Sequence, residues 1–241
     1  MAVEELNASE LGTKEYWSSA YTKELENFNA YGDDGEVWFG EQNERRVAKW
    51  IAKHFAVSES VIDIGCGNGH LLVRLASEHG FTCLTGLDYV EEALALAKAL
   101  TAAQNVQDRI KFKVCDLLSG RSEVLARVDS QPHAVVVDKG TYDAICLMPN
   151  MNNDKRAAYT AAVKALIEGG TADCTERSRE ATYEKARFVI TSCNWTREEL
   201  TTHFADDFEV VEELPTPTLS FGGQQGRTVT SLIFKAKRTC S

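Results

Sequence analysis

Short runs of apolar residues recur along this chain, and segments of helical periodicity separate most of them. The runs are Val61–Ile64, Cys83–Leu87, Ile110–Val114, Ala134–Val137, Phe188–Thr191, Phe208–Val211 and Val229–Phe234. The first five are rich in valine and isoleucine and are too short for helices, which is typical of parallel strands buried on both faces. The alternation of strand and helix therefore limits the chain to the α/β class.

The segments around these runs predict how the strands are connected. Apolar residues repeat at helical spacing over 47–55, 71–76, 93–100 and 158–166. Asp154 is expected to cap one of these helices, and Thr196 with Glu199 forms a capping box after the fifth run. Because the last two runs have no helical pattern between them, they are expected to pair antiparallel as a hairpin. We therefore expect one domain over 1–241: a doubly wound, mostly parallel seven-stranded sheet with a C-terminal antiparallel hairpin and helices on both faces.

The turn after the first run carries the strongest motif. Gly65, Gly67 and Gly69 follow the strand directly, and His70 begins the next helical segment. Glycines allow a tight turn and a close approach of the backbone to a ligand, whose anionic group can meet the amides at a helix N-terminus. The dinucleotide fingerprint has its third glycine one residue later, at the position of His70. An ordinary tight strand-to-helix turn is the alternative interpretation of these glycines.

Two acidic residues stand at the ends of the next strands. Asp88 follows the second run, where an acid can accept both hydroxyls of an adenosine ribose. Asp116 follows the third run, where it could meet the adenine amine. Taken singly, Asp88 can be an ordinary helix cap and Asp116 a solvated loop acid. Together with the glycine turn they lie at the carboxyl edge of the sheet, where open α/β folds bind ligands.

With these features the sequence resembles the class I, or seven-stranded, methyltransferases, whose glycine turn has the form Gly-x-Gly-x-Gly. The terminal hairpin separates it from dehydrogenases, whose last strand would be parallel. It is similar in more detail to the lysine methyltransferases that modify eukaryotic translation elongation factor 1-alpha, in particular the single-domain subfamily sometimes called methyltransferase-like protein ten. The motifs that carry this resemblance occur in order along most of the chain: Leu11–Trp17, Tyr31–Gly40, Val137–Ile145, Thr191–Thr196 and Glu213–Pro217.

The resemblance implies a Rossmann-like protein-lysine N-methyltransferase that uses S-adenosylmethionine and acts on the elongation factor. The three glycines would line the methionine part of the cofactor, Asp88 would hold the ribose and Asp116 the adenine end. The full set of implied cofactor contacts is Trp38, Gly40, Asp63, Gly65, Gly67, Asn68, Gly69, Asp88, Tyr89, Cys115, Asp116, Leu117 and Asp138. The implied catalytic and substrate-side residues are Asp138, Tyr142, Asn194 and Trp195, with Asp138 beside the point of methyl transfer. No metal is expected.

The sequence departs from the family pattern at two places. Residues 171–187 lengthen a turn that is usually tight, and we expect them to form a flexible surface insertion. Many related lysine methyltransferases carry an acid-x-x-aromatic motif after the fourth strand, whereas Asp138 and Tyr142 are four residues apart here. The role of Asp138 as the lysine binder is therefore left open. Lys139, beside it, is expected to be an ion-pair partner rather than a catalytic amine.

Aromatic side chains are needed around a methyl-accepting lysine, because an aromatic pocket desolvates the amine and stabilises the methylated cation. Trp38, Phe39, Tyr142 and Trp195 are the candidates, and packing in the core is the alternative for each of them.

The charge and cysteine content narrow the partners. A net charge of −10 argues against non-specific nucleic-acid binding and against an anionic membrane surface. Residues 1–60 carry 12 acidic and 6 basic residues, and we expect 1–56 to form an N-terminal cap and a lead-in helix whose charge would steer a basic protein substrate. The seven cysteines are scattered without a C-x-x-C pair, which fits a reducing cytoplasm or nucleus.

Other functions on the same fold stay open at this point. A small-molecule methyltransferase with the N-terminal segment as its lid is one alternative, and a cofactor-binding scaffold without catalysis is another. A nicotinamide oxidoreductase is disfavoured by the glycine spacing and by the terminal hairpin. We expect a monomeric cytoplasmic enzyme, with presence in the nucleus not excluded.

Overall fold

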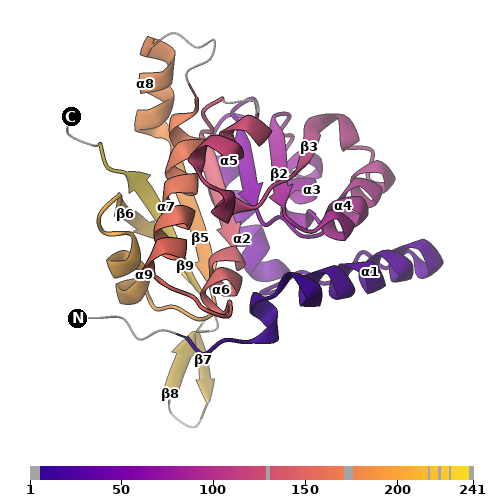
Figure 1. The fold of residues 1–241 in the computed structure, drawn as a ribbon. Coiled ribbons are helices and arrows are strands. Elements are labelled where there is room, and N and C mark those ends of the chain that lie inside the picture. The colour runs from indigo at the N-terminus through magenta and orange to yellow at the C-terminus, as the bar shows by residue number, and fades with distance from the viewer. Residues whose placement is uncertain are drawn as a thin grey trace.

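A seven-stranded sheet of order β3-β2-β1-β4-β5-β9-β6 forms the centre of the computed structural model (Figure 1). The structure describes residues 6–128, 131–170, 176–216, 218–221, 224–227 and 229–238. The strands of the sheet are β1 (Val61–Ile64), β2 (Leu84–Asp88), β3 (Ile110–Val114), β4 (Val135–Lys139), β5 (Arg187–Ser192), β6 (Phe208–Glu213) and β9 (Thr230–Ala236). β1 to β5 are parallel, and β9 pairs antiparallel with both β5 and β6. The expected mostly parallel sheet with an antiparallel C-terminal pair is confirmed.

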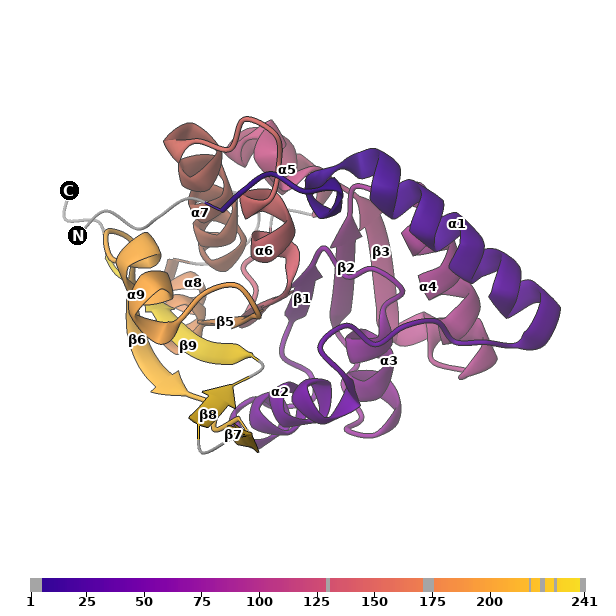
Figure 2. The ribbon, with the colours of Figure 1, turned by 90° about the horizontal axis from the view of Figure 1, so that it is seen from below.

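Helices cover both faces of this sheet. They are α1 (Lys14–Tyr31), α2 (Glu41–His54), α3 (His70–Ser77), α4 (Glu91–Ala103), α5 (Arg121–Arg127), α6 (Thr141–Cys146), α7 (Asn153–Glu168), α8 (Glu176–Lys185) and α9 (Arg197–Phe204), with 3-10 turns η1 (Glu10–Gly12), η2 (Gln107–Arg109) and η3 (Leu117–Ser119). Figure 2 shows α5, α6 and α7 on one side of the sheet and α2 and α3 on the other. Within the described residues, no helix is both long and apolar enough to cross a membrane.

The central strands β4 and β5 are nearly continuous apolar runs because each face of the sheet is buried there. In β4, Val136 packs in the core under α7, whereas its neighbours Val135 and Val137 pack in the core under α2 and α3. The same alternation places Phe188 on the first face and Val189 on the second. Successive side chains of a strand point to opposite faces, so a strand between two helical layers needs apolar residues at every position.

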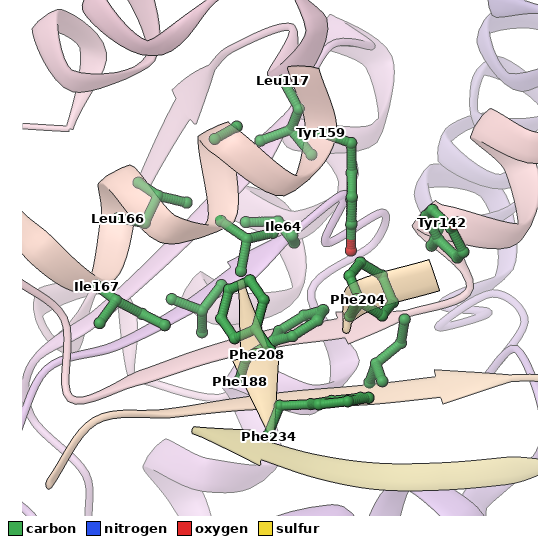
Figure 3. Close-up of a cluster of buried hydrophobic side chains, with 14 of the residues drawn as sticks. Ile64, Leu117, Tyr142, Tyr159, Leu166, Ile167, Phe188, Phe204, Phe208 and Phe234 are labelled. Atoms are coloured by element: carbon green, nitrogen blue, oxygen red, sulfur yellow. The ribbon is translucent and has the colours of Figure 1, made fainter. Parts of the chain in front are cut away.

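An aromatic cluster joins the antiparallel end of the sheet to its helices (Figure 3). The ring centroid of Phe188 on β5 lies 5.5 Å from that of Phe204 on α9, 5.6 Å from that of Phe208 on β6 and 5.9 Å from that of Phe234 on β9. Edge-to-face and offset aromatic pairs of this kind add to the stabilisation from buried area. The cluster fixes α9 and the antiparallel strands against the parallel part of the sheet.

Some local predictions from the sequence need correction. Helix α7 is capped by Asn152, whose side chain accepts the N–H of Lys155, and not by Asp154. The capping box of Thr196 and Glu199 is confirmed. A two-stranded ribbon of β7 (Thr218–Phe221) and β8 (Gln224–Arg227), which the sequence did not indicate, lies between β6 and β9.

Part of the segment expected as a surface insertion has regular secondary structure. Residues Glu176–Lys185 form helix α8, and Arg187 is already the first residue of β5. Residues 171–175 lie outside the described residues. The flexibility of this segment stays a prediction.

The N-terminal helix α1 was not predicted, although Trp17, Tyr21, Leu25 and Phe28 repeat in it at helical spacing. Thr13 caps it, and Tyr21 buries its ring in a small apolar cluster with Val90 and residues of α4. Both views show α1 lying beside α4 (Figures 1 and 2). One face of α1 is therefore held against the main domain next to the ends of β1 and β2.

The strand order has its switch point between β1 and β4. β1 pairs with β2 on one side and with β4 on the other. The strands after β1 therefore run outward to β3 on one side, and those after β4 run outward on the other side. In doubly wound sheets the crevice at the carboxyl ends of such strands is the usual ligand site.

Candidate active site

A cavity opens at the carboxyl ends of β1, β2, β3 and β4, at the switch point. Its wall is made by residues that follow these strands, by the start of α6, by the segment after β5 and by the N-terminal segment. The lining residues are Leu11, Gly12, Trp17, Tyr21, Trp38, Phe39, Gly65, Cys66, Gly67, Asn68, Asp88, Tyr89, Cys115, Asp116, Leu117, Leu118, Lys139, Gly140, Thr141, Asp143, Ala144, Ile145, Leu147, Met148, Cys193 and Asn194. Ten of the residues that the sequence assigned to the site are among them: Trp38, Gly65, Gly67, Asn68, Asp88, Tyr89, Cys115, Asp116, Leu117 and Asn194.

The glycine turn after β1 forms one wall of the cavity. Gly65 and Gly67 have φ values of 65° and 53°, in the left-handed region. A Cβ at Gly67 would collide with the hydroxyl oxygen of Tyr21, and one at Gly65 with the side chain of Thr141. Glycine is therefore required at both positions by backbone conformation and by close packing. Gly69 does not line the cavity; it precedes α3 and packs against Ala97 and Phe112.

Asp88, the last residue of β2, presents a buried carboxylate to the cavity. It is 6% exposed, and its oxygens accept the N–H groups of Gly67 and Val90, each at 2.9 Å. Burial raises the pKa of Asp88 to about 6. A carboxylate has about four acceptor sites, so each oxygen can accept a further hydrogen bond. These free acceptor positions fit a ligand that presents two adjacent hydroxyl groups.

Residues after β3 form the end of the cavity next to Asp88. Asp116 accepts the N–H of Leu118 at 2.8 Å, and Cys115 and Leu117 are buried beside it. Tyr89 lines the same end, and the Lys14 ammonium of α1 lies 5.5 Å from the centroid of its ring. The apolar and aromatic surface around Asp116 suits a flat heterocycle.

Aromatic residues of the N-terminal segment cover the cavity. Trp17 of α1 has its ring centroid 5.1 Å from that of Trp38 and 6.0 Å from that of Tyr21. The loop that carries Trp38 and Phe39 is held by the Lys139 ammonium, which donates to the Trp38 carbonyl at 3.2 Å. Trp17 and Tyr21 were missed in the sequence, although a signal was present: Trp17, Tyr21, Leu25 and Phe28 repeat at helical spacing and form one face of α1. Trp17 does stand in the motif Leu11–Trp17 that carried the family resemblance.

The same loop is tied to the glycine turn. The Asn68 side chain donates to the Glu36 carbonyl at 2.9 Å, and a ring nitrogen of His70 lies 2.9 Å from the Asp34 carbonyl oxygen. Gly40 at the end of the loop is the residue before α2, with a φ of 80°, and it does not line the cavity. Gly40 thus ends the loop and does not contribute a contact to the cavity wall.

Lys139 forms an ion pair, as the sequence predicted, and its partner is an acid of α2. Its ammonium lies 3.9 Å from the Glu44 carboxylate, and Glu44, fully buried on α2, also accepts from Arg74 at 2.9 Å. Asp63 on β1 is buried behind the cavity wall and does not line it. Burial raises the pKa of Asp63 to about 8, an effect that the charge of Lys139 opposes.

Asp138 is not placed at the cavity surface, contrary to expectation. It is fully buried, and its carboxylate accepts the N–H groups of Thr141 and Tyr142, each at 2.9 Å, and the hydroxyl of Tyr159. Burial raises the pKa of Asp138 to about 7. The chain turns into α6 directly after β4, so this carboxylate points back onto the first N–H groups of that helix.

Two of the expected aromatic residues belong to the core and not to the cavity. Tyr142 packs in the aromatic cluster (Figure 3), and its hydroxyl lies 2.9 Å from Nδ1 of His203 and accepts from Arg156 Nε at 2.9 Å. Trp195 is buried, with its ring centroid 4.6 Å from that of His203. For both residues the packing alternative is the one that the structure shows, whereas Trp38 and Phe39 line the cavity.

Asp143 on α6 lines the cavity and was not among the expected residues. It is 5% exposed, and burial raises its pKa. Its carboxylate accepts from the Ser192 hydroxyl and, at 2.8 Å, from the N–H of Cys193. Asp143 is within the motif Val137–Ile145, but the sequence alone did not show which acid of this motif faces the cavity.

The charges in the wall are predominantly negative. Among the described lining residues, the charged side chains are the carboxylates of Asp88, Asp116 and Asp143 and the ammonium of Lys139, which is paired with Glu44. A cavity of this kind, largely apolar with a few buried carboxylates, favours a ligand that carries hydroxyl groups and positive charge.

Comparisons with known proteins agree with this geometry. A family model described as "Methyltransferase domain" matches residues 56–236. The chain is 41% identical over 239 residues to EEF1A lysine methyltransferase 2 of Mus musculus, covering 99% of this chain and 88% of that protein. It is 33% identical over 247 residues to the protein-lysine N-methyltransferase efm4 of Schizosaccharomyces pombe, covering 95% of each. Among solved structures, the glycopeptide N-methyltransferase MtfA complexed with sinefungin has the same fold, with a TM-score of 0.56 at 12% identity over 83% of this chain and 96% of that one.

Proposed function

Because the chain belongs to the methyltransferase-domain family and, within it, to the family of the EEF1A lysine methyltransferase 2 proteins, we propose that it methylates a lysine of translation elongation factor 1-alpha. The observation that carries the proposal is the buried Asp88 carboxylate beside a glycine turn in one cavity, on a chain similar along its whole length to protein-lysine methyltransferases. A small-molecule methyltransferase would share the cavity, but the similarity to protein-modifying enzymes extends over the N-terminal segment as well.

S-adenosylmethionine is the methyl donor of this family, and the cavity fits it. Asp88 would hold the ribose hydroxyls with the acceptor positions that its backbone partners leave free. Asp116 with Cys115 and Leu117 would hold the adenine end, and the backbone of the turn at Gly65 and Gly67 would hold the methionine part. When bound, the cofactor supplies the methyl group of its sulfonium for transfer to the lysine nitrogen.

The N-terminal segment closes the cavity in this proposal. Trp17 and Tyr21 of α1 and Trp38 of the following loop all line it. The segment is fixed at its start, where the Ser9 N–H donates to the Leu147 carbonyl at 3.0 Å, and later through Lys139 and the Trp38 carbonyl. Exclusion of water by this cover strengthens the electrostatic interactions inside the site.

The residues of the wall prepare a lysine for methylation. A lysine amine attacks only in its neutral form, although its ordinary pKa is about 10.4. A partly buried pocket disfavours the ammonium, and aromatic faces such as those of Trp38 and Phe39 stabilise the cation that each methylation regenerates. Asn194, which follows β5 and lines the cavity, lies on the substrate side of this arrangement.

The direct test is incubation of the protein with labelled S-adenosylmethionine and purified elongation factor 1-alpha. We expect label on one lysine of the factor, located by mass spectrometry, and at least about tenfold less product with Asp88→Ala at limiting cofactor, since a charged hydrogen-bond acceptor is lost. Label in a metabolite of a cell extract and never in protein would instead indicate the small-molecule function. Tight cofactor binding without turnover on any protein would indicate a scaffold.

The state and place of action are part of the same proposal. We propose a monomer that acts in the cytoplasm on protein and not on nucleic acid or membranes. The net charge of −10 argues against nucleic acid and anionic membranes as partners. The five described cysteines are free thiols, which supports a reducing compartment such as the cytoplasm. Size-exclusion chromatography with light scattering measures the mass, and a dimer would contradict the first part.

A further inference from the structure

Asp143 carries a buried carboxylate on the cavity wall that the cofactor contacts proposed above leave unused. It lies on the first turn of α6, after β4, and contacts Ser192 and Cys193 at the end of β5. The residues expected to hold the cofactor follow β1, β2 and β3, on the other side of the switch point. Asp143 and Asn194 therefore lie on the side of the cavity from which an acceptor would enter.

The hydrogen bonds around Asp143 show that both of its oxygens act as acceptors. The Ser192 hydroxyl oxygen accepts the N–H groups of Asn194 and Trp195, at 3.1 and 3.0 Å. With both of its lone pairs used, Ser192 directs its single proton to one carboxylate oxygen, and the Cys193 N–H donates to the other. These hydrogen bonds favour the ionised form of Asp143 and oppose the effect of burial, which raises its pKa.

This buried anion has no cationic partner. Within the described parts of the chain, no basic side chain forms an ion pair with Asp143, whereas buried Glu44 is paired with Arg74. A buried carboxylate without a cation is costly and is normally balanced by a partner of opposite charge. Asp143 lines the cavity, where a ligand cation would supply that balance.

We propose that Asp143 binds the amine of the substrate lysine, first as the ammonium that enters the cavity and then as the nitrogen that becomes positively charged on methylation. This inference rests on the proposed function, and it assigns to Asp143 the role that the sequence had suggested for Asp138. The anionic oxygens orient the amine, and they stabilise the positive charge that accumulates on nitrogen as it bonds to the methyl group. The proton that the ammonium must first lose passes to water.

The experiment measures the coupling between Asp143 and the substrate lysine. The target lysine of elongation factor 1-alpha is first located by mass spectrometry with wild-type enzyme, and a lysine-to-methionine variant of the factor is made. The affinity of both forms of the factor is then measured by calorimetry for wild-type enzyme and for Asp143→Asn, with S-adenosylhomocysteine present so that no turnover occurs. With wild-type enzyme, loss of the lysine should weaken binding of the factor by about tenfold or more. Tenfold corresponds to the smallest coupling energies measured between close charge pairs. With Asp143→Asn the same change should weaken binding less than twofold.

Ser192→Ala is the control for the charge, because it removes the hydrogen bonds of Ser192 with Asp143, Asn194 and Trp195 and leaves the carboxylate in place. In Ser192→Ala, the loss of affinity caused by removing the target lysine should remain close to that of wild type. If instead Asp143→Asn keeps the full lysine dependence, or if Ser192→Ala loses it to the same extent, the proposal is refuted and Asp143 is structural. Affinity for S-adenosylhomocysteine within about threefold of wild type shows that a variant is folded, and Asp143→Ala with the same expected result replaces Asp143→Asn if that variant does not fold. No methylation of any protein by wild type would refute the function together with this role.

Discussion

Replacing Asp88 by asparagine separates its contribution to cofactor binding from its contribution to the fold. The two oxygens of Asp88 accept N–H groups from Gly67 and Val90, so the amide group of asparagine can satisfy only one of them. A buried donor without an acceptor costs about 1–3 kcal/mol. In the opposite direction, the pKa of about 6 in the fold, against about 3.9 in an unfolded chain, means that ionised Asp88 costs the fold roughly 3 kcal/mol at neutral pH. Asparagine removes this cost, so we expect the free energy of unfolding to change by no more than about 2 kcal/mol.

Cofactor affinity should change much more. Hydrogen bonds to a charged group contribute about 1.5–3 kcal/mol, so loss of the charged acceptor should weaken binding of S-adenosylmethionine by roughly 10- to 150-fold. Isothermal calorimetry at pH 7.5 measures the affinity, and thermal unfolding without cofactor measures the fold. Equal dissociation constants for wild type and Asp88→Asn would refute the reasoning and leave Asp88 as a residue that only organises the turn at Gly67.

The pH dependence of the same variant gives the sign of the effect. Because burial raises the pKa of Asp88 to about 6, the fold is favoured by protonation of this group, and its contribution to stability is lost as the pH rises through about 6. Ligand hydroxyls donate to the ionised form, so the affinity of wild type should fall as the pH drops below about 6. Asp88→Asn should show a weaker dependence in this range, and identical slopes would contradict the assignment.

Three further changes test the cover of the cavity and the charge of the N-terminal segment. Lys139→Met removes the hydrogen bond to the covering loop and the ion pair with buried Glu44. We expect the free energy of unfolding to fall by about 1–3 kcal/mol and cofactor binding to weaken. Each kcal/mol corresponds to a decrease in Tm of about 2–4 °C. An unchanged Tm in scanning fluorimetry would show that this contact does not stabilise the loop. Gly67→Ala should abolish cofactor binding, because the left-handed conformation costs about 1–2 kcal/mol and the new Cβ collides with Tyr21. Gly32→Ala, at the end of α1, is left-handed as well, with φ 70° and ψ 26°, and has no atom within 4 Å of its Cβ, so it serves as the control with strain alone. If the 12 acidic against 6 basic residues of 1–60 steer a basic substrate, kcat/KM should fall as salt rises, and an unchanged value would show that this charge serves only solubility.

Most of the scaffold could be predicted from the sequence, for local reasons. The central parallel strands were visible as nearly continuous apolar runs, because a strand buried on both faces has few polar positions, whereas the edge strand β3 alternates Lys111 and Lys113 with apolar residues. The positions of Gly65, Gly67, Asp88 and Asp116 followed from the same reasoning, since residues at the carboxyl ends of adjacent parallel strands are brought together by the sheet. These residues needed no knowledge of side-chain packing to be placed in one cavity.

The substrate side could not be predicted in this way. Asp138 and Asp143 lie in the same motif, and both are acids near the end of β4. The turn into α6 directs Asp138 onto the helix N–H groups and brings Asp143, further along that helix, against Cys193 at the end of β5. Which acid faces the cavity depends on where the helix begins relative to the strand, and a sequence specifies such boundaries only to within a few residues.

The sequence by itself thus determined the sheet, its switch point and the wall of the cavity where β1, β2 and β3 end, because these depend on periodicity and on the residues that end each strand. Only the tertiary structure decided what covers and completes the cavity. Helix α1 is largely polar, and its side chains Trp17 and Tyr21 reach the site because the helix packs on α4. Tyr142 follows β4 as expected, but it does not line the cavity because its ring is buried in the aromatic cluster. A local repeat of Trp17, Tyr21, Leu25 and Phe28 marks the buried face of α1, but only contacts between segments distant in sequence place that face at the cavity.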